Sequence, residues 1–172
     1  TAIFASEGGL VKANGSSLTN GLEIDVQKGA VAIAAMGANS KVEAKYSTIT
    51  YNGDGYALYS DGAGKIDVSN SKIKLYGKST GFEKDLTGTF NITLAGTKFE
   101  VYSNDVTIAN LKGVSTLALN NLTGTIAANT SGLQHSAGTD PVTGEVYNKY
   151  RVAAIDGVNA FDLNANLDKS LA

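Results

Sequence analysis

Glu43 and Asp67 are the residues whose types and spacing come closest to acid–base chemistry. They hold the same position in two copies of a repeated nine-residue unit, so stacked copies would bring the two carboxylates onto neighbouring turns. Carboxylates at that distance can share a proton and act as acid and base, as in glycoside or uronide cleavage. The alternative is an ordinary solvated face, because Lys12 lies one copy before Glu43 and Lys45 follows it by two residues. We adopt this alternative, predict no catalytic residues and expect a non-enzymatic protein.

Tyr147, Lys149, Tyr150 and Arg151 are the candidate ligand-binding residues. Tyrosine faces stack on sugars and peptides, and arginine makes paired hydrogen bonds to acidic groups. The competing interpretation is that Tyr150 packs against the first strand of the next turn. We predict that the four residues are part of a contact surface.

Glycine- and aspartate-rich loops offer a weaker indication of metal binding. Gly53–Gly55 and Asp61–Gly64 resemble fragments of calcium-binding nonapeptide loops, but the tandem repetition that forms stacked calcium sites is missing. His135 is the single histidine, and the chain has no cysteine to supply a thiolate ligand. We therefore interpret the glycines as corners and expect no metal site and no cofactor.

A nine-residue unit that occurs four times dominates the sequence. Its first position is Val or Ile, its third Ala, Val or Leu, and its eighth Leu, Ile or Phe, and its copies start 24 to 31 residues apart. A drifting period in this range is typical of a repeat array. The copies are Val11–Thr19, Val42–Thr50, Ile66–Lys74 and Ile92–Glu100.

Each unit has the pattern of a strand, a sharp corner and a second strand. Positions one and three are apolar around a polar residue, which is the period of a strand with one buried face. The fifth position is Gly or Asn in three copies, and these residues tolerate the left-handed backbone of a bend. A further strand precedes the first three units, at Ala2–Ile3, Ala32–Ile33 and Ala57–Leu58. Three short strands per turn of about 25 residues predict an all-β parallel β-helix. A β-sandwich is the alternative, although its strands need not repeat by residue type.

Stacking in register would align equivalent residues into ladders about 4.8 Å apart. We predict two aliphatic or aromatic ladders inside the solenoid and a third ladder of hydroxyls. The first contains Val11, Val42, Ile66 and Ile92; the second contains Leu18, Ile49, Ile73 and Phe99; the third contains Ser16, Ser47, Ser71 and Thr97. A longer corner from Asn20 to Gly29 widens the first turn, and the alternation of Leu22–Val26 predicts a strand within it.

We treat residues 1–172 as a single β-helix segment whose pattern is interrupted once, at residues 127–149. This stretch holds the only proline and the only histidine, and Asp140, Pro141 and Gly144 are typical of a hairpin tip. We predict a loop or hairpin inserted into one turn and projecting from the solenoid, where repeat proteins often place binding residues.

Composition narrows the function classes further. The formal net charge of −2 gives no general attraction to nucleic acid, and no nucleic-acid partner is expected. No run of 18 apolar residues is present to form a membrane-spanning helix. Both ends leave turns uncapped, so we expect the segment to be part of a longer protein.

Residues 53–82 resemble turns of type V autotransporter passenger domains, and are most similar to the large outer-membrane autotransporter adhesins of fusobacteria. Ser103–Ile108 and Ala153–Gly157 add to the likeness. The resemblance implies a right-handed parallel β-helix, displayed on the surface of a Gram-negative bacterium or secreted from it. It also implies an outer-membrane β-barrel that would anchor the full-length protein from a C-terminal position. The resemblance lies in the repeat pattern and includes no catalytic motif, so it implies no active-site residues.

The function expected from these observations is adhesion, with the segment acting as stalk or as binding face. Its partner would be a protein or glycan on a host or bacterial cell surface. A vacuolating-toxin-like passenger is one alternative, and it would oligomerise and bind membranes. A polysaccharide-cleaving β-helix enzyme is the other, and it would need several acidic residues with Arg or Lys in one groove.

Overall fold

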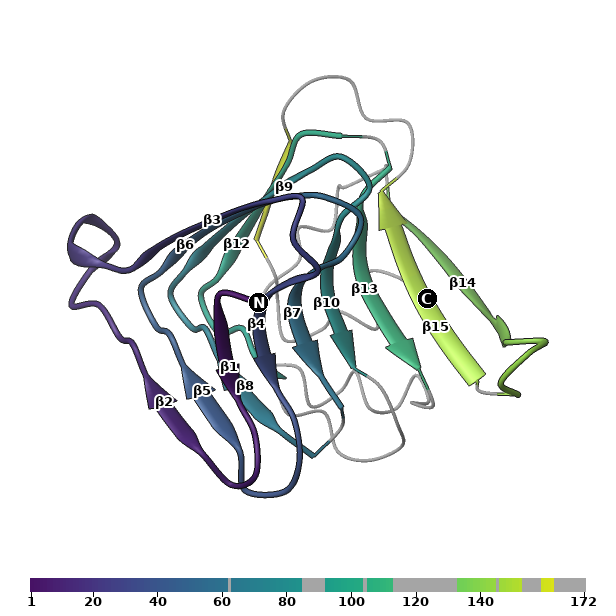
Figure 1. Ribbon diagram of the computed structural model, residues 1–172. Coiled ribbons are helices and arrows are strands. Elements are labelled where there is room, and N and C mark those ends of the chain that lie inside the picture. Colours follow the sequence, from purple (N-terminus) through teal and green to yellow (C-terminus); the bar gives the residue numbers. More distant parts are fainter. Residues whose placement is uncertain are drawn as a thin grey trace.

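The chain folds as a right-handed parallel β-helix with three short strands per turn. The computed structural model describes residues 1–61, 63–84, 92–103, 105–112, 133–144, 146–152 and 159–162. In Figure 1 the chain circles clockwise as it recedes from the N-terminal turn, and the strands of successive turns lie beside one another. Every third strand joins the same sheet, so three parallel sheets enclose one apolar core.

The three sheets, which we call A, B and C, follow the order of the strands along the chain. Sheet A contains β1 (Ile3–Ala5), β4 (Val31–Ala35), β7 (Tyr56–Ser60), β10 (Thr80–Lys84) and β13 (Thr107–Lys112). Sheet B contains β2 (Leu10–Lys12), β5 (Lys41–Glu43), β8 (Lys65–Asp67) and β11 (Ile92–Thr93). Sheet C contains β3 (Glu23–Gln27), β6 (Thr48–Asn52), β9 (Lys72–Tyr76) and β12 (Lys98–Val101). Three antiparallel strands complete sheets A and C: β14 (Leu133–Thr139), β15 (Val146–Val152) and β16 (Asn159–Asp162).

The first predicted ladder is confirmed. Val11 pairs with Val42, Val42 with Ile66, and Ile66 with Ile92. Val42, Ile66 and Ile92 are almost completely buried, whereas Val11 in the first turn is covered on one side only. The upstream strands at Ile3, Ile33 and Leu58 are also present, as β1, β4 and β7, and they stack in the same way.

The second ladder is wrong at its first member. Ile49, Ile73 and Phe99 are in register, but Ile24 pairs with Ile49 where Leu18 was predicted. Leu18 begins the one-turn 3₁₀ helix η1 (Leu18–Asn20), and its side chain is 47% exposed. The Ser17 hydroxyl accepts a hydrogen bond from the Asn20 amide at 3.2 Å and stabilises this turn. The inserted corner therefore transfers the core position to the predicted strand at Leu22–Val26, which contains Ile24.

The hydroxyl ladder holds for three of its four predicted members. The Ser71 hydroxyl accepts from the Ser47 amide at 3.0 Å, and the Thr97 hydroxyl accepts from the Ser71 amide at 3.3 Å. All three residues are buried. Ser16 is exposed, and its backbone amide donates within the widened corner to the Asn20 carbonyl at 3.3 Å. The ladder therefore satisfies amides at the corner between sheets B and C only where the repeat is regular.

Replacing Ser71 by alanine is expected to lower the free energy of unfolding by about 1–3 kcal/mol, because it leaves the buried Ser47 amide without its acceptor. Thermal or denaturant unfolding measures this loss. Ser71→Thr is the matched control and should cost less, because Thr97 occupies the equivalent position in the next turn. Equal stabilities for Ser71→Ala and the wild type would show that the ladder does not stabilise the fold.

The corner residues differ from the prediction in two copies. Asn70 and Gly96 adopt the left-handed backbone, with φ of 54° and 70°, but so does Tyr46, at 58°, while Gly15 does not. The Tyr46 amide donates to the Ser69 carbonyl of the next turn at 3.1 Å, so the register of the stack imposes the bend on a tyrosine. Gly15 is small for another reason, because a Cβ there would lie 2.4 Å from the Gly21 Cα.

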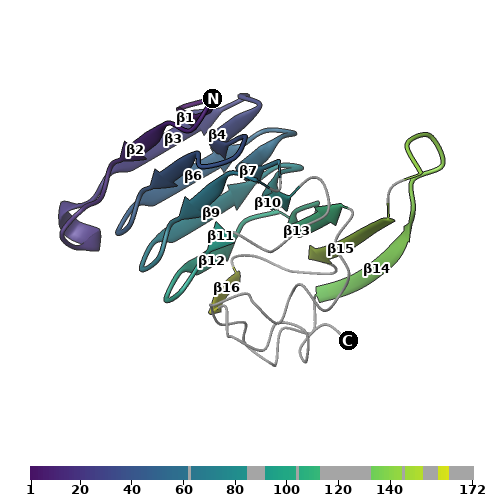
Figure 2. The same ribbon diagram turned by 90° about the horizontal axis from the view of Figure 1, so that it is seen from below.

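The region of the predicted insertion contains a β-hairpin. Strands β14 and β15 pair with each other, and β15 also pairs antiparallel with β13, so the hairpin extends sheet A beyond its parallel strands (Figure 2). Its turn spans Asp140–Gly144, where the Asp140 carboxylate accepts from the Val142 and Thr143 amides. The hairpin continues to Val152, and residues 127–132 lie outside the described part of the chain. That residues 127–149 form an insertion stays a prediction. None of the helices in the described ranges is long and apolar enough to cross a membrane.

Candidate binding surface

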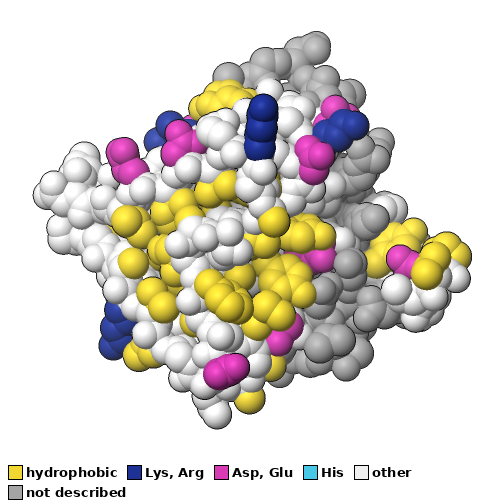
Figure 3. All heavy atoms as spheres, in the orientation of Figure 1, with side chains coloured by type: hydrophobic (Ala, Val, Ile, Leu, Met, Phe, Trp, Pro, Cys, Tyr) yellow, Lys and Arg dark blue, Asp and Glu magenta, His cyan; other side chains and the backbone are white. Residues whose placement is uncertain are grey.

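The outer face of sheet A carries a patch of apolar and aromatic side chains, of which Phe4 and Met36 are exposed and Tyr56 and Tyr59 are partly exposed. Phe4, Ala34 and Tyr59 stand in one row across β1, β4 and β7, and their chain neighbours Ala5, Ile33 and Leu58 belong to the core. We call the patch formed by Phe4, Ala34, Met36, Tyr56 and Tyr59 the sheet A patch. In Figure 3 hydrophobic side chains gather over these strands, with the charged side chains mostly around them.

The chemistry of the sheet A patch is that of a contact surface. Phe4 is 49% exposed and Met36 38% exposed, while Ala34 is only 4% exposed because larger side chains flank it. The rings of Tyr56 and Tyr59 lie 5.8 Å apart at 36° to each other, so the two rings meet at a tilt and do not stack face to face. Aromatic residues and methionine are enriched, and charged residues depleted, at the centres of protein interfaces. Such a patch is suited to bind an apolar or sugar-like surface.

A buried polar pair follows the patch along the same row. Tyr59 pairs with Glu83 and Glu83 with Asn110, and both polar residues are more than nine-tenths buried. The Asn110 side-chain amide donates to Glu83 Oε2 at 2.9 Å. This row on the outer face of sheet A therefore changes from apolar and aromatic residues in the first three turns to buried polar residues in the fourth and fifth.

The four residues predicted to bind a ligand all lie on β15, in the same sheet as the patch. Lys149 is in register with Asn110, Tyr150 with Ala109, and Arg151 with Thr107. Tyr147 is partly exposed, and a Cβ on its cross-strand partner Gly138 would lie 2.7 Å from the Tyr147 hydroxyl, so this tyrosine lies across the glycine. The side chains of Lys149, Tyr150 and Arg151 lie outside the described part of the structure, and their role stays a prediction.

Phe4 was not predicted from the sequence as a candidate binding residue, and Tyr56 and Tyr59 were ranked below Tyr147 and Tyr150. A signal was present, because each strand upstream of a repeat unit places one residue outward next to its Ile or Leu. That position reads Phe4, Ala34, Tyr59 in the first three turns. Outward positions of a β-helix are expected to be polar, so apolar residues there indicate a contact surface.

Glu43 and Asp67 are neighbours in register, but each has its own cation. Lys41 Nζ lies 2.7 Å from Glu43, and Lys45 Nζ lies 3.3 Å from Asp67. The hydrogen bond from Lys41, followed by that from Asn14, holds the pKa of the Glu43 carboxyl below its usual value. A carboxyl group with a lowered pKa is a poor general acid at neutral pH, so the geometry favours ion pairing over a shared proton.

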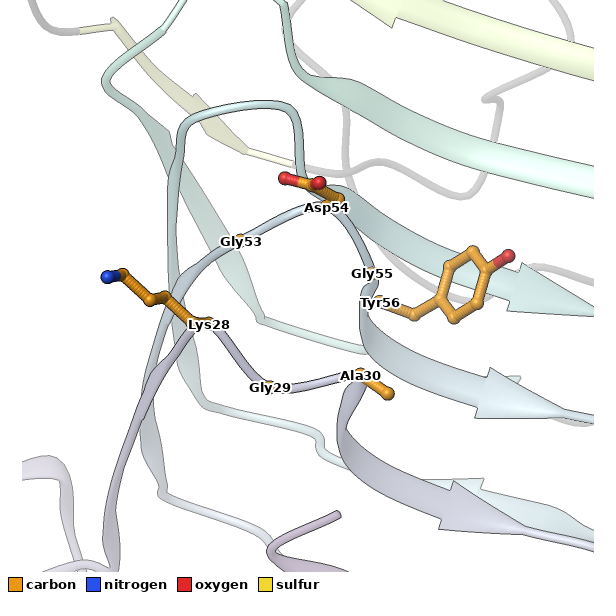
Figure 4. A pocket seen from close by; sticks show the side chains of 7 residues that line it. All are labelled: Lys28, Gly29, Ala30, Gly53, Asp54, Gly55 and Tyr56. Carbon is orange, nitrogen blue, oxygen red and sulfur yellow. The ribbon is translucent and has the colours of Figure 1, made fainter.

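The hollow at the corner between sheets C and A has a volume of about 690 Å³ and is lined by Lys28, Gly29, Ala30, Gly53, Asp54, Gly55 and Tyr56. Figure 4 shows the side chains of Lys28, Asp54 and Tyr56 pointing in different directions, so they do not converge on one ligand. Beneath the hollow, the Tyr51 hydroxyl accepts from the Gly55 amide at 2.9 Å and donates to the Gly29 carbonyl. Burial raises the pKa of Tyr51, which keeps the hydroxyl protonated. The polar groups of this corner are thus used by the fold.

The second loop that resembled a calcium site also bonds to its own backbone. Asp61 Oδ1 accepts from the Ala63 and Gly64 amides at 3.0 Å, and Oδ2 accepts from the Gly37 amide of the preceding turn at 2.7 Å. Across the residues that the structure describes, no three His, Cys, Asp or Glu side chains gather closely enough to hold a metal ion. Asp61 is instead a link between turns.

Asp61→Asn is expected to destabilise the fold at neutral pH, because both carboxylate oxygens accept hydrogen bonds and the asparagine side chain has only one acceptor oxygen. Although burial opposes ionisation, the three amide hydrogen bonds lower the pKa of Asp61. The stabilisation is therefore present above the unfolded-state pKa of about 3.9 and is lost as pH falls through the lower folded-state pKa. Denaturant unfolding from neutral to acid pH should show the wild type and the variant converging at low pH. Asp54→Asn, at an exposed corner, is the control; a difference that does not change with pH would contradict the account.

Comparisons of the chain with protein-family models, with curated proteins and with solved structures found no match.

Proposed function

We propose that this chain is a non-enzymatic, surface-displayed segment that acts in adhesion to host or bacterial cells, with the outer face of sheet A as its binding face. The observation that carries the proposal is the sheet A patch, because the register of the turns places the exposed Phe4, the small Ala34 and the partly exposed Tyr59 in one outward row. Strand β15, which carries Tyr147 and the three other predicted binding residues, extends the same sheet.

The architecture supports this role in a second way. Stacked turns hold their outer residues at a fixed spacing of about 4.8 Å, so a rigid and extended surface is available without a loop that must order on binding. A surface of this kind fits a protein or a glycan on another cell. The expected location is the exterior of a Gram-negative cell, in keeping with the resemblance to autotransporter passengers.

Tyr59→Ser is expected to weaken binding to cells at least about tenfold, as the loss of an aromatic anchor does at protein interfaces. The experiment compares binding of the labelled wild type and the variant to epithelial and bacterial cells. Leu18→Ser is the control, because it removes an exposed apolar side chain that lies in η1, away from sheet A. Deleting residues 127–149 would remove β14 and half of β15, so point variants are the sharper test. Equal binding by Tyr59→Ser and the wild type would exclude the sheet A patch as the binding face.

A further inference from the structure

The outer face of sheet C changes charge sign over its first three turns, and in the fourth turn Lys98 and Glu100 continue its two outward rows with opposite charges. Glu23 and Asp25 face outward from the first turn, and Thr48 and Thr50 hold the same positions in the second. Lys72 and Lys74 follow in the third turn, in register with the threonines. In both rows the outward side chains are therefore acidic in the first turn, uncharged in the second and basic in the third.

Of the four charged residues in the first three turns, only Lys72 has an ion pair among the residues that the structure describes. Among the described residues, neither Glu23 nor Asp25 has an ion pair, although Asp25 accepts a hydrogen bond from Gln27 at 2.6 Å. Lys72 lies 3.3 Å from Glu100, and the same carboxylate is the register neighbour of Lys74, which has no ion pair in the described part of the chain. Glu23, Asp25 and Lys74 thus lack an ion-pair partner among the described residues, and Lys72 would contact a second molecule while it remains paired with Glu100.

We propose that the outer face of sheet C binds a second copy of this chain, with the two solenoids antiparallel. A two-fold axis along β6 would place each row opposite itself and the first turn of one copy opposite the third turn of the other. Glu23 then faces Lys72, and Asp25 faces Lys74, of the second copy. The threonines of the central turn face each other, without charge repulsion. This inference does not depend on the adhesive role of sheet A, since it concerns a different face.

The interface is expected to be weak and sensitive to salt. A five-residue strand is about 17 Å long and three strands span about 10 Å, so two such faces bury less than the roughly 1,000 Å² typical of a stable complex. Complementary charges contribute mainly specificity and association rate, and salt screens them. Many copies displayed side by side would strengthen the contact through their high local concentration.

Sedimentation equilibrium of the wild type over a range of protein and salt concentrations measures the self-association. Asp25→Lys and Lys74→Glu should each raise the dissociation constant at least about tenfold, since the symmetry introduces two repulsive contacts per dimer. An equimolar mixture of the two variants should associate again, because the introduced lysine of one copy then faces the introduced glutamate of the other. Asp54→Lys and Lys65→Glu make the same charge changes away from sheet C and should have no effect.

Three outcomes would overturn the proposal: a wild type that stays monomeric at all concentrations, association that neither variant weakens, or variants that fail to associate when mixed. Circular dichroism of each variant confirms that the fold is retained. The cell-binding test of Tyr59→Ser concerns only sheet A, and the self-association test concerns only sheet C. Either proposal can therefore fail without affecting the other.

Discussion

Ile66→Asp is expected to lower the free energy of unfolding by about 4 kcal/mol or more, and to leave little folded protein at 37 °C. Ile66 is 1% exposed and stands in the middle of a ladder, with Val42 on one side and Ile92 on the other. A carboxylate at this position would be shielded from solvent, and the neighbouring ladder residues are aliphatic and cannot donate hydrogen bonds to it. The cost therefore combines the burial of a charge with the loss of packing in three consecutive turns. Thermal unfolding followed by circular dichroism measures the loss.

Ile66→Val is the matched control for this prediction. It removes one methylene group from the same position and keeps the aliphatic ladder, which costs about 0.5–1.5 kcal/mol. Aspartate and valine variants of equal stability would show that Ile66 does not face the core, and the assignment of inside and outside would be wrong.

Gly55→Val is the second substitution with a large expected effect, a loss of about 3 kcal/mol or more. A Cβ at Gly55 would lie 1.9 Å from the Ala30 carbonyl oxygen and 2.6 Å from the Tyr51 hydroxyl. The carbonyl oxygen belongs to the backbone of the neighbouring turn, so it can move only if the stacking of the two turns changes. Tyr51 would also lose the geometry of its hydrogen bond from the Gly55 amide.

Gly144→Val is the control that separates the steric clash at Gly55 from the general cost of replacing a glycine. Gly144 has a left-handed backbone, with φ of 73°, but nothing lies within 4 Å of a Cβ placed there. Strain at that turn is expected to cost about 1–2 kcal/mol. Denaturant unfolding of both variants should show the larger loss for Gly55, and a smaller loss at Gly55 would contradict the close stacking of the turns.

The ladders could be predicted from the sequence because stacking repeats residue types at equivalent positions. Val42, Ile66 and Ile92 show this pattern directly. The same reasoning failed at Leu18, because the nine-residue pattern continues there while a local 3₁₀ turn moves the chain out of register. It failed at Tyr46 as well, since the hydrogen bond to the next turn outweighs the preference of tyrosine against the left-handed region.

The candidate site could be predicted only in part. Tyr147 and its neighbours were found as a local cluster of residue types, but the sequence does not show which turn their strand joins. Phe4 and Tyr59 are 55 residues apart, and they come close only through the register of two intervening strand pairings. An outward row of this kind can be identified only after the buried ladders show which side chains of each strand face the core.

Saturable binding of the purified wild-type chain to intact epithelial and bacterial cells, together with a glycan array, tests the adhesive role most directly. We expect saturable binding to at least one of these surfaces, with competition by unlabelled wild type but not by Tyr59→Ser. Absence of saturable binding to every surface would contradict the proposal that this segment contains a binding face.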